Sequence, residues 1–156
     1  MAEVATRWPL PRIGGRDPIA TPVPDDPRFG VEVSYGGYDF GGELFVPVSA
    51  VQGGEVAFAC ETVTGYAVTI DHGAWCTYYA HLSKMFVTQN LRRRARLQRV
   101  KPGEVIGYAA KRPLHIRFEV WNRTLTEGWK ATDALAEIGS WRIDCPENDL
   151  RTPEAA

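Results

Sequence analysis

Between Phe29 and Trp121 the sequence consists of short apolar runs separated by glycine-containing turns. Val, Ile, Phe, Tyr and Thr dominate runs of about four to eight residues, which is typical of β-strands. Apolar and polar residues alternate in ETVTGYAVTID, which indicates a sheet with one face exposed to water. We therefore predict an all-β domain over residues 28–122, with an antiparallel sandwich or roll as its architecture. The runs are FGVEVSY, ELFVPVSAV, GEVAFAC, YAVTIDH, TYYAHLS, KMFVTQ, EVIGYAA and LHIRFEVW.

The two ends of the chain differ from this central part. Residues 1–27 hold six of the eleven prolines, and proline can sustain neither a helix nor a central strand because it lacks the backbone N–H. We predict an extended arm over 1–27, with Trp8 as its point of docking on the domain. The segment 123–156 contains WKATDALAEIG, which predicts a short helix over 132–138, with a loose polar tail after it. Thr132 or Asp133 is the expected N-cap of this helix, and Gly139 is its expected end.

The charge of the chain is balanced overall but concentrated locally. A formal net charge of −1 excludes a globally basic nucleic-acid binder, yet five of the eighteen basic residues lie within eight positions. Apolar residues alternate with arginines in LRRRARLQR, which predicts a hairpin over 88–100 with an arginine-rich face. Such a face suits an acidic protein partner, and a solvated hairpin is the alternative. Nucleic acid is not favoured, because few aromatic residues interleave the charges. The arginines are Arg92, Arg93, Arg94, Arg96 and Arg99.

Cysteine usage and the N-terminal sequence suggest a compartment. Cys60, Cys76 and Cys145 are odd in number and lie at no metal-like spacing, so we expect buried thiols in a reducing environment. MAEVATRWPLPR lacks the apolar run of a secretory signal, and no segment has the length of a membrane span. We expect synthesis in the cytoplasm, with a virion or an injection particle as a further destination.

The stretch PLHIRFEV places a histidine and an arginine two residues apart in a predicted strand. Side chains at i and i+2 of a strand share a face, so His115 and Arg117 point to the same side. A second histidine in place of Arg117 would suggest a zinc site, because imidazole is a common zinc ligand. The arginine raises the question of whether the site has been rebuilt.

The phrases IDHGAWCTYYAHLS, VKPGEVIG and LHIRFEV resemble, in order and spacing, the lysostaphin/LytM family of zinc endopeptidases, which cut peptide cross-links in bacterial cell walls. WPLP near the N-terminus and FVPVSAVQGGEV are also similar to segments of that family. The resemblance covers residues 8–138 and implies a lysostaphin-type β fold. It also implies that His72, in the DHG turn, has a structural role.

The resemblance locates the residues of the family's active site in this sequence. His81 and His115 lie where the family has its two catalytic, non-ligand histidines. The three positions that supply zinc ligands in the family hold Arg28, Glu32 and Arg117. The loop before the last histidine motif is shortened to YAAKRP, and the link between Val87 and Val100, which contains the arginines, is longer than is usual in the family.

These substitutions argue against a metal. A guanidinium stays protonated and offers no lone pair, so Glu32 alone could bind zinc, which takes about three protein ligands. We predict no cofactor, and zinc only if the ligand positions have been misassigned. Instead we predict that Glu32 bridges Arg28 and Arg117 in charge-assisted hydrogen bonds. His81 and His115 would then be framework residues, with a ligand or a binding role as the alternatives. Trp121, Trp129 and Trp141 are expected to pack the C-terminal segment onto the sheet rather than to bind sugar.

Three functions follow from the resemblance. The favoured one is a catalytically inactive peptidase-like domain used as a structural or binding module, as a subunit of a phage tail, a baseplate or a related injection particle. Its partners would be other protein subunits, with a cell-wall peptide as a further candidate. The alternatives are a regulator of cell-wall amidases and an active zinc endopeptidase with displaced ligands.

Overall fold

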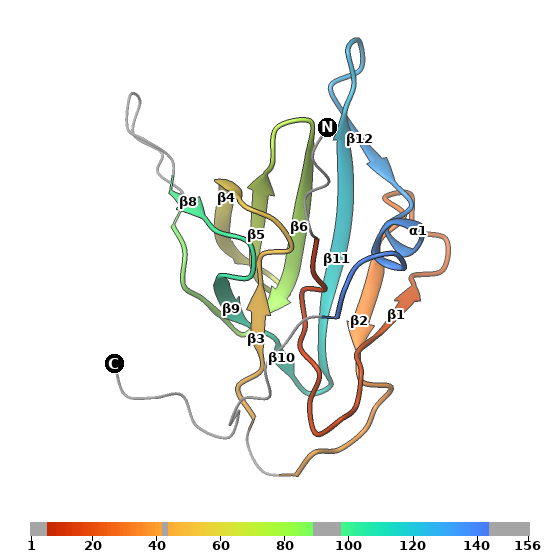
Figure 1. The fold of residues 1–156 in the computed structure, drawn as a ribbon, viewed down its shortest axis with the longest axis vertical. Helices are drawn as coiled ribbons and strands as arrows, with labels where there is room; N and C mark the ends of the chain where they lie inside the picture. The colour runs from red at the N-terminus through yellow and green to blue at the C-terminus, as the bar shows by residue number, and fades with distance from the viewer. Residues whose placement is uncertain (1–5, 42–43, 89–97, 144–156) are drawn as a thin grey trace.

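The structure is a computed structural model that describes residues 6–41, 44–88 and 98–143. It confirms the predicted all-β class with a single short helix near the C-terminus (Figure 1). Nine strands form a large antiparallel sheet in the order β1-β2-β11-β6-β5-β4-β8, with β10 and β12 also paired to β11. These strands are β1 (Ile19–Pro22), β2 (Val31–Ser34), β4 (Gly54–Thr62), β5 (Gly65–Asp71), β6 (Trp75–Leu82), β8 (Arg99–Val100), β10 (Ala110–Lys111), β11 (Leu114–Arg123) and β12 (Trp129–Thr132).

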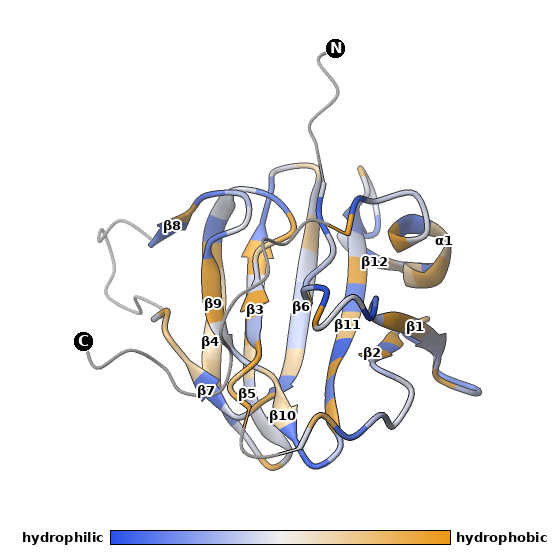
Figure 2. Ribbon diagram, turned by 60° about the horizontal axis from the view of Figure 1, so that its bottom comes forward, coloured by the Kyte–Doolittle hydropathy of each residue, from blue (hydrophilic) through white to orange (hydrophobic). Residues whose placement is uncertain are grey.

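A second, smaller sheet shares its core with the large one. It contains β3 (Pro47–Ser49), β9 (Val105–Tyr108) and β7 (Lys84–Met85) in the order β3-β9-β7. Figure 2 shows hydrophobic residues along β3 and much of β9. One cluster of buried side chains unites Val48 and Ile106 of the small sheet with Val68 and Phe118 of the large sheet. The two sheets therefore fold as a single unit.

Strand β11 has one face that points into the core and one face that points away from it, which we call the open side. Ile116, Phe118 and Val120 are at most 1% exposed and point into the core. Burying each such side chain contributes about 1.5–3 kcal/mol, which fixes the register of the strand. Successive strand residues point to opposite faces, so the odd-numbered residues of β11 must point away from the core. The open side therefore carries the residues on which the question of function depends.

The predicted N-terminal arm lies on the domain over its described part. β1 pairs with β2 at the edge of the large sheet, the position in a sheet where proline is tolerated. Trp8 is partly buried against the core, whereas Leu10 is 1% exposed and is the deeper anchor. Backbone contacts fix this anchor, because the amide of Ser49 donates to the carbonyl of Pro9 at 2.9 Å.

The C-terminal helix α1 (Ala134–Ile138) begins after Asp133, as predicted. The Asp133 carboxylate accepts hydrogen bonds from the amides of Leu135 and Ala136, which satisfies two of the free donors at the helix start. Thr132, the other candidate cap, ends β12, a strand that the sequence did not reveal. Ala134 and Ile138 are buried, so the helix covers part of the core.

The predicted arginine hairpin lies mostly outside the described residues. Arg92, Arg93, Arg94 and Arg96 are among the residues that the structure does not describe. Its two ends meet, because the amide of Thr88 donates to Gln98 Oε1 at 2.9 Å. Arg99 belongs to β8, where it forms an exposed ion pair of 2.9 Å with Glu55. The described residues include no helix that is long and apolar enough to cross a membrane.

Two of the three cysteines are described, and both are free thiols. Burial, together with the nearby carboxylate of Asp71, raises the pKa of Cys76 to about 11. Cys60 is partly exposed, and Cys145 lies outside the described residues. Cys76 is therefore a protonated, unreactive thiol at neutral pH.

Candidate functional site

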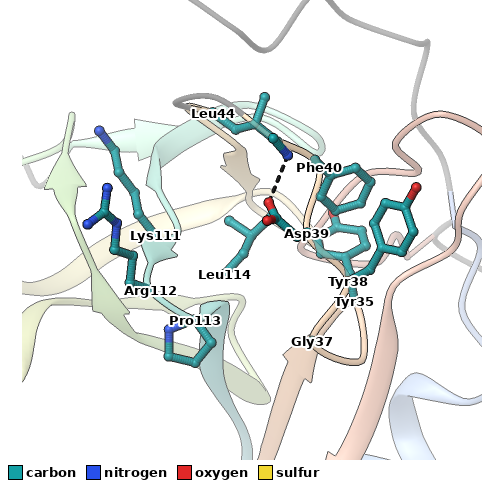
Figure 3. A pocket seen from close by; sticks show the side chains of 11 residues that line it. Tyr35, Gly37, Tyr38, Asp39, Phe40, Leu44, Lys111, Arg112, Pro113 and Leu114 are labelled. Atoms are coloured by element: carbon teal, nitrogen blue, oxygen red, sulfur yellow. Dashed lines mark hydrogen bonds between the residues drawn. The ribbon is translucent and has the colours of Figure 1, made fainter.

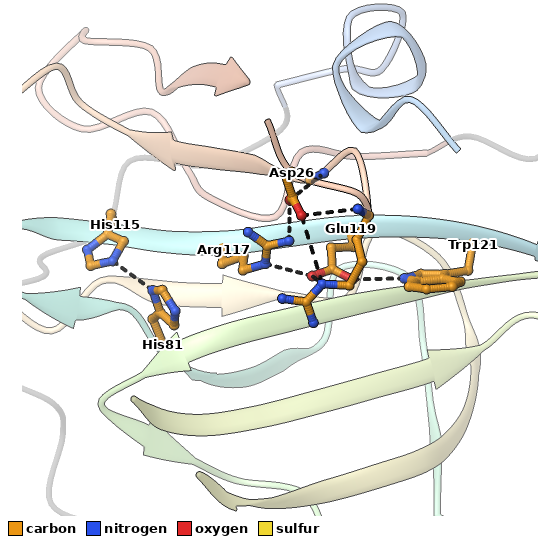
Figure 4. A network of polar contacts seen from close by, with 8 residues as sticks. Asp26, His81, His115, Arg117, Glu119 and Trp121 are labelled. Atoms are coloured by element: carbon orange, nitrogen blue, oxygen red, sulfur yellow. Dashed lines mark hydrogen bonds and ion pairs between the residues drawn. The ribbon is translucent and has the colours of Figure 1, made fainter. Parts of the chain in front are cut away.

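The open side of β11 presents His115, Arg117, Glu119 and Trp121 in a row (Figure 4). Antiparallel pairing places Glu32 of β2 directly opposite Arg117. Directly paired residues of two strands share a face. The fold thus brings together the sequence-predicted residues His115, Arg117 and Glu32.

Arg117 is the centre of a buried ion-pair network. Its Nε donates to Glu119 Oε2 at 2.6 Å, and its Nη2 donates to Asp26 Oδ2 in a shorter bond (Figure 4). The side chains of Asp26, Glu119 and Arg117 are only 6%, 2% and 13% exposed. The second oxygen of Glu119 accepts from the indole Nε1 of Trp121 at 2.9 Å. Each carboxylate is therefore compensated by charge and by hydrogen bonds, which a buried ion requires.

Asp26 is held by the backbone of the turn that precedes β2. Its two oxygens accept hydrogen bonds from the amides of Arg28 and Gly30, each at 3.0 Å. Burial acts to raise the pKa of Asp26, but these amide bonds and the Arg117 guanidinium outweigh it, and the pKa lies below the ordinary value. A side chain at Gly30 would place its Cβ 2.8 Å from Arg117 Nη2, so glycine is needed for the approach. The conformation of the turn and the position of the Arg117 guanidinium therefore depend on each other.

Arg28 occupies the rim of the network rather than its centre. Its side chain is 51% exposed, and its Nε lies 3.6 Å from Glu119 Oε2 and 3.9 Å from Asp26 Oδ1. Such long, exposed ion pairs contribute about 0–1 kcal/mol. The guanidinium of Arg28 is therefore accessible to a ligand.

The predicted bridging role of Glu32 is wrong. Glu32 forms no ion pair within the described part of the chain, whereas Asp26 and Glu119 provide the carboxylates that Arg117 contacts. The physical reason is that the backbone amides of Arg28 and Gly30 already orient Asp26, and the indole of Trp121 already orients Glu119. With two carboxylates and two guanidiniums the network is formally neutral.

His81 and His115 bond to each other beside this network. His81 Nδ1 and His115 Nε2 are 3.1 Å apart, and His115 Nδ1 lies 2.7 Å from the carbonyl oxygen of Pro113. A carbonyl only accepts, so His115 carries its proton on Nδ1 and accepts at Nε2 from His81 Nδ1–H. Burial, then the nearby His115 and Arg117, lower the pKa of His81, while Glu32 opposes the shift. His81 therefore favours the neutral form, and its Nε2 then carries a lone pair.

A groove of about 440 Å³ continues along the open face from the ion-pair network. Aromatic side chains form part of its walls, and Arg28 and Glu119 also line it. Trp121 and Trp129 line this groove, whereas Trp141 packs against Trp75 and Phe118 at centroid distances of 5.8 Å. The aromatic lining consists of Phe58, Tyr78, Trp121 and Trp129.

A second pocket of about 480 Å³ lies at the other end of β11 (Figure 3). Tyr38 and Phe40 form one side, and Lys111 and Arg112 lie opposite them. The shortened loop before β11 makes this wall, because only Arg112 and Pro113 separate β10 from β11. The pocket thus has an aromatic side and a basic side.

Comparison with known proteins supports the resemblance seen in the sequence. The profile of peptidase family M23 matches residues 34–129. The chain belongs to peptidase family M23. The match begins after Arg28 and Glu32, so these two positions are assigned by the local motif and by the pairing of β2 with β11.

Several solved structures share this M23 fold. A chain from the SpoIIQ–SpoIIIAH pore-forming complex is 19% identical, with a TM-score of 0.59, over 85% of this chain and 89% of that one. A LytM protein from Ruminococcus gnavus is 18% identical, with a TM-score of 0.61, over 92% of this chain and 64% of that one. Lysostaphin from Staphylococcus simulans, an antimicrobial peptidase, is 20% identical, with a TM-score of 0.54, over 81% of this chain and 49% of that one. No curated protein sequence matches the chain significantly.

The residues of this M23 domain do not fit a zinc ion. Arg28 and Arg117 cannot donate an electron pair, and Arg117 already bonds two carboxylates. Within residues 6–41, 44–88 and 98–143 no three His, Cys, Asp or Glu side chains are grouped so that they could hold a metal. The donor set is thus unsuited to the metal that the resemblance implies.

Two residues of the site were missed from the sequence. Glu119 could have been found, because it follows Arg117 by two residues in a strand and must share its face. Asp26 could not, because its position depends on the conformation of the turn before β2. In that turn Phe29 adopts a positive φ of 52°.

Proposed function

We propose that this chain is a catalytically inactive M23 domain that serves as a binding or structural module. The observation that carries the proposal is the pairing of Arg117 with Asp26 and Glu119 at the position where the resemblance implies a zinc ligand. A guanidinium that is permanently protonated and already donates hydrogen bonds to two carboxylates cannot act as a metal ligand there.

The chemistry of amide hydrolysis supports the same conclusion. In a zinc peptidase the metal polarises the scissile carbonyl and lowers the pKa of the attacking water. Two imidazoles that bond to each other cannot replace a Lewis acid, and His81 Nδ1 is already engaged with His115 Nε2. His81 and His115 are therefore residues of an inactive site.

The groove supports a binding role. Its aromatic walls and the half-exposed guanidinium of Arg28 offer apolar contact together with a donor for a carboxylate. We propose that the ligand is a cell-wall peptide that is held but not cut.

The finer proposal is that the domain is a subunit of a phage tail, a baseplate or a related injection particle, and so a component of a virion or such a particle. The arginine-rich stretch of the sequence between β7 and β8 supports a protein partner, because it suits an acidic surface. One similar fold comes from the SpoIIQ–SpoIIIAH pore-forming complex, an assembly of two proteins.

Sedimentation with purified peptidoglycan sacculi tests the proposal. We expect the protein to co-sediment with the sacculi without releasing soluble fragments or clearing the suspension. Trp129→Ala should weaken this binding, because Trp129 lines the groove and is 37% exposed. Leu125→Ala is the matched control, because Leu125 is fully exposed but does not line the groove.

Other outcomes would identify the alternative functions. Chelator-sensitive clearing of the sacculi would show an active zinc endopeptidase with displaced ligands. Stimulation of a cell-wall amidase by the protein, without binding to sacculi, would favour the regulator. Either result would replace the inactive binding module.

A further inference from the structure

Three aromatic rings form a row on the small sheet, away from the groove. The ring of Tyr108 lies 4.8 Å from that of Phe86 and 5.5 Å from that of Phe45. Phe86 is 42% exposed, and Phe45 and Tyr108 are half-buried. We call these residues the aromatic row. Exposed aromatic clusters of this kind are typical centres of protein interfaces.

A lysine lies over each end of the aromatic row. The Nζ of Lys111 is 3.8 Å from the ring centroid of Phe45, and the Nζ of Lys84 is 5.6 Å from that of Phe86. Both lysines are exposed. In Figure 3 the side chain of Lys111 extends on the side of the pocket away from Phe40. The ring faces attract these ammonium groups and so place two positive charges beside the apolar centre.

The charge of the surrounding strands has a single sign. All residues of β3, β7, β9 and β10 are described, and their only charged members are Lys84 and Lys111. Arg112, which follows β10, is also exposed. In the sequence, the arginine-rich stretch begins soon after Phe86. The four strands around the aromatic row therefore contribute only positive charge, although the whole chain has a formal net charge of −1.

We propose that the aromatic row is a docking surface for an acidic segment of a partner protein. Apolar side chains of the segment would cover Phe86 and Tyr108, and its carboxylates would pair with Lys84 and Lys111. Charge complementarity of this kind sets specificity and association rate. This site lies apart from the groove and does not depend on whether the groove binds a ligand.

The geometry disfavours stacked bases or sugars as the occupant. The planes of Phe86 and Tyr108 are 89° apart and those of Phe45 and Tyr108 are 56° apart, so the rings do not offer parallel faces. Single-stranded nucleic acid needs such faces for successive bases. Lys111 also covers one face of Phe45.

The test is a titration of the full isotope-labelled chain, followed by NMR, with a synthetic peptide that alternates glutamate and leucine. The variants are Lys84→Glu and Lys111→Glu for the charged ends and Phe86→Ala for the apolar centre. Lys130→Glu is the matched control for charge reversal, because its side chain is 69% exposed on β12. Leu125→Ala is the control for the loss of an exposed apolar side chain. Far-ultraviolet circular dichroism verifies that each variant is folded.

We expect saturable shifts at the aromatic row and affinity at least about tenfold weaker in each Glu variant, because each variant places like charges together. The Phe86→Ala variant should also bind more weakly, and both controls should bind as the unmodified chain does. Equal affinity for a peptide in which lysine replaces glutamate, shifts confined to other surfaces, or no saturable binding would overturn the proposal. Preferential binding of oligothymidine at the same residues would assign the surface to nucleic acid instead. None of these outcomes alters the sedimentation with sacculi, so the two proposals fail separately.

Discussion

The two faces of the large sheet each carry a polar network, and the networks differ in kind. On the core side, the hydroxyl of buried Tyr79 accepts from the amide of Val51 at 3.0 Å and lies 2.8 Å from the hydroxyl of Thr77. On the open side, Arg117 bonds the carboxylates of Asp26 and Glu119. The core network is uncharged, whereas the open-face network consists of ions.

His72 completes the core network and shows what it does. Its Nε2 lies 2.9 Å from Thr77 Oγ1, and its Nδ1 lies 2.8 Å from the carbonyl oxygen of Gly53. Burial lowers the pKa of His72, although the Gly53 carbonyl and Asp71 oppose the shift. This network joins Gly53, which precedes β4, to Thr77 of β6. The fold can therefore persist when the chemistry of the open face changes.

The largest difference between the networks should appear when their central residue is removed. Arg117→Ala leaves the buried carboxylates of Asp26 and Glu119 without their closest counter-charge. We expect the free energy of unfolding to fall by about 3–5 kcal/mol, measured by urea denaturation. Arg28→Ala is the matched control and should cost less than about 1 kcal/mol, because Arg28 is 51% exposed. Equal effects of the two substitutions would contradict the assignment of Arg117 as the centre.

Removal of one hydroxyl from the core network should have a smaller effect. Tyr79→Phe leaves the amide of Val51 and the hydroxyl of Thr77 with fewer partners in a buried place. We expect a loss of about 1–3 kcal/mol in the same denaturation experiment. A loss as large as that of Arg117→Ala would mean that the charged network is not the more sensitive one.

The two networks should also differ in their response to acid. The pKa of Asp26 is lower in the folded chain than its ordinary value of 3.8, so the unfolded chain takes up this proton first as the pH falls. The contribution of Asp26 to stability is therefore complete above pH 3.8 and is lost as the pH falls through the folded pKa. We expect the stability of the unmodified chain to decline more steeply with acidification in this range than that of Asp26→Asn. Parallel declines in urea denaturation at a series of pH values would refute the ionic role of Asp26.

The smallest effect concerns the histidine pair. His115→Asn removes one of the causes that lower the pKa of His81, after burial itself. We expect the NMR titration midpoint of His81 to move up toward 6.5, the ordinary pKa of histidine. The midpoint of His72 should stay the same, because His72 bonds to Gly53 and Thr77 rather than to His81 or His115. A shift at both histidines would show that the two networks are coupled.

The sequence predicted the fold better than it predicted the site. Short β-branched runs and the Asp133 cap are local signals, and the structure bears out the strands and the helix that they indicate. The site depends on contacts between distant segments. Arg117 is oriented by Asp26, which is 91 residues away in the chain, and no strand or helix pattern indicates that contact. A bridging role for Glu32 was predicted from its position beside Arg117, but register alone does not decide where a long side chain turns.

Zinc binding tests the central claim most directly, namely that ion pairs have replaced the metal site of this M23 domain. The unmodified chain and the variant R28H/E32D/R117H are each incubated with zinc, desalted and measured by mass spectrometry of the metal. We predict that the unmodified chain retains only traces of zinc, whereas the variant, which regains three possible ligands, retains substantially more. Near-stoichiometric zinc in the unmodified chain, removable by a chelator, would contradict this account.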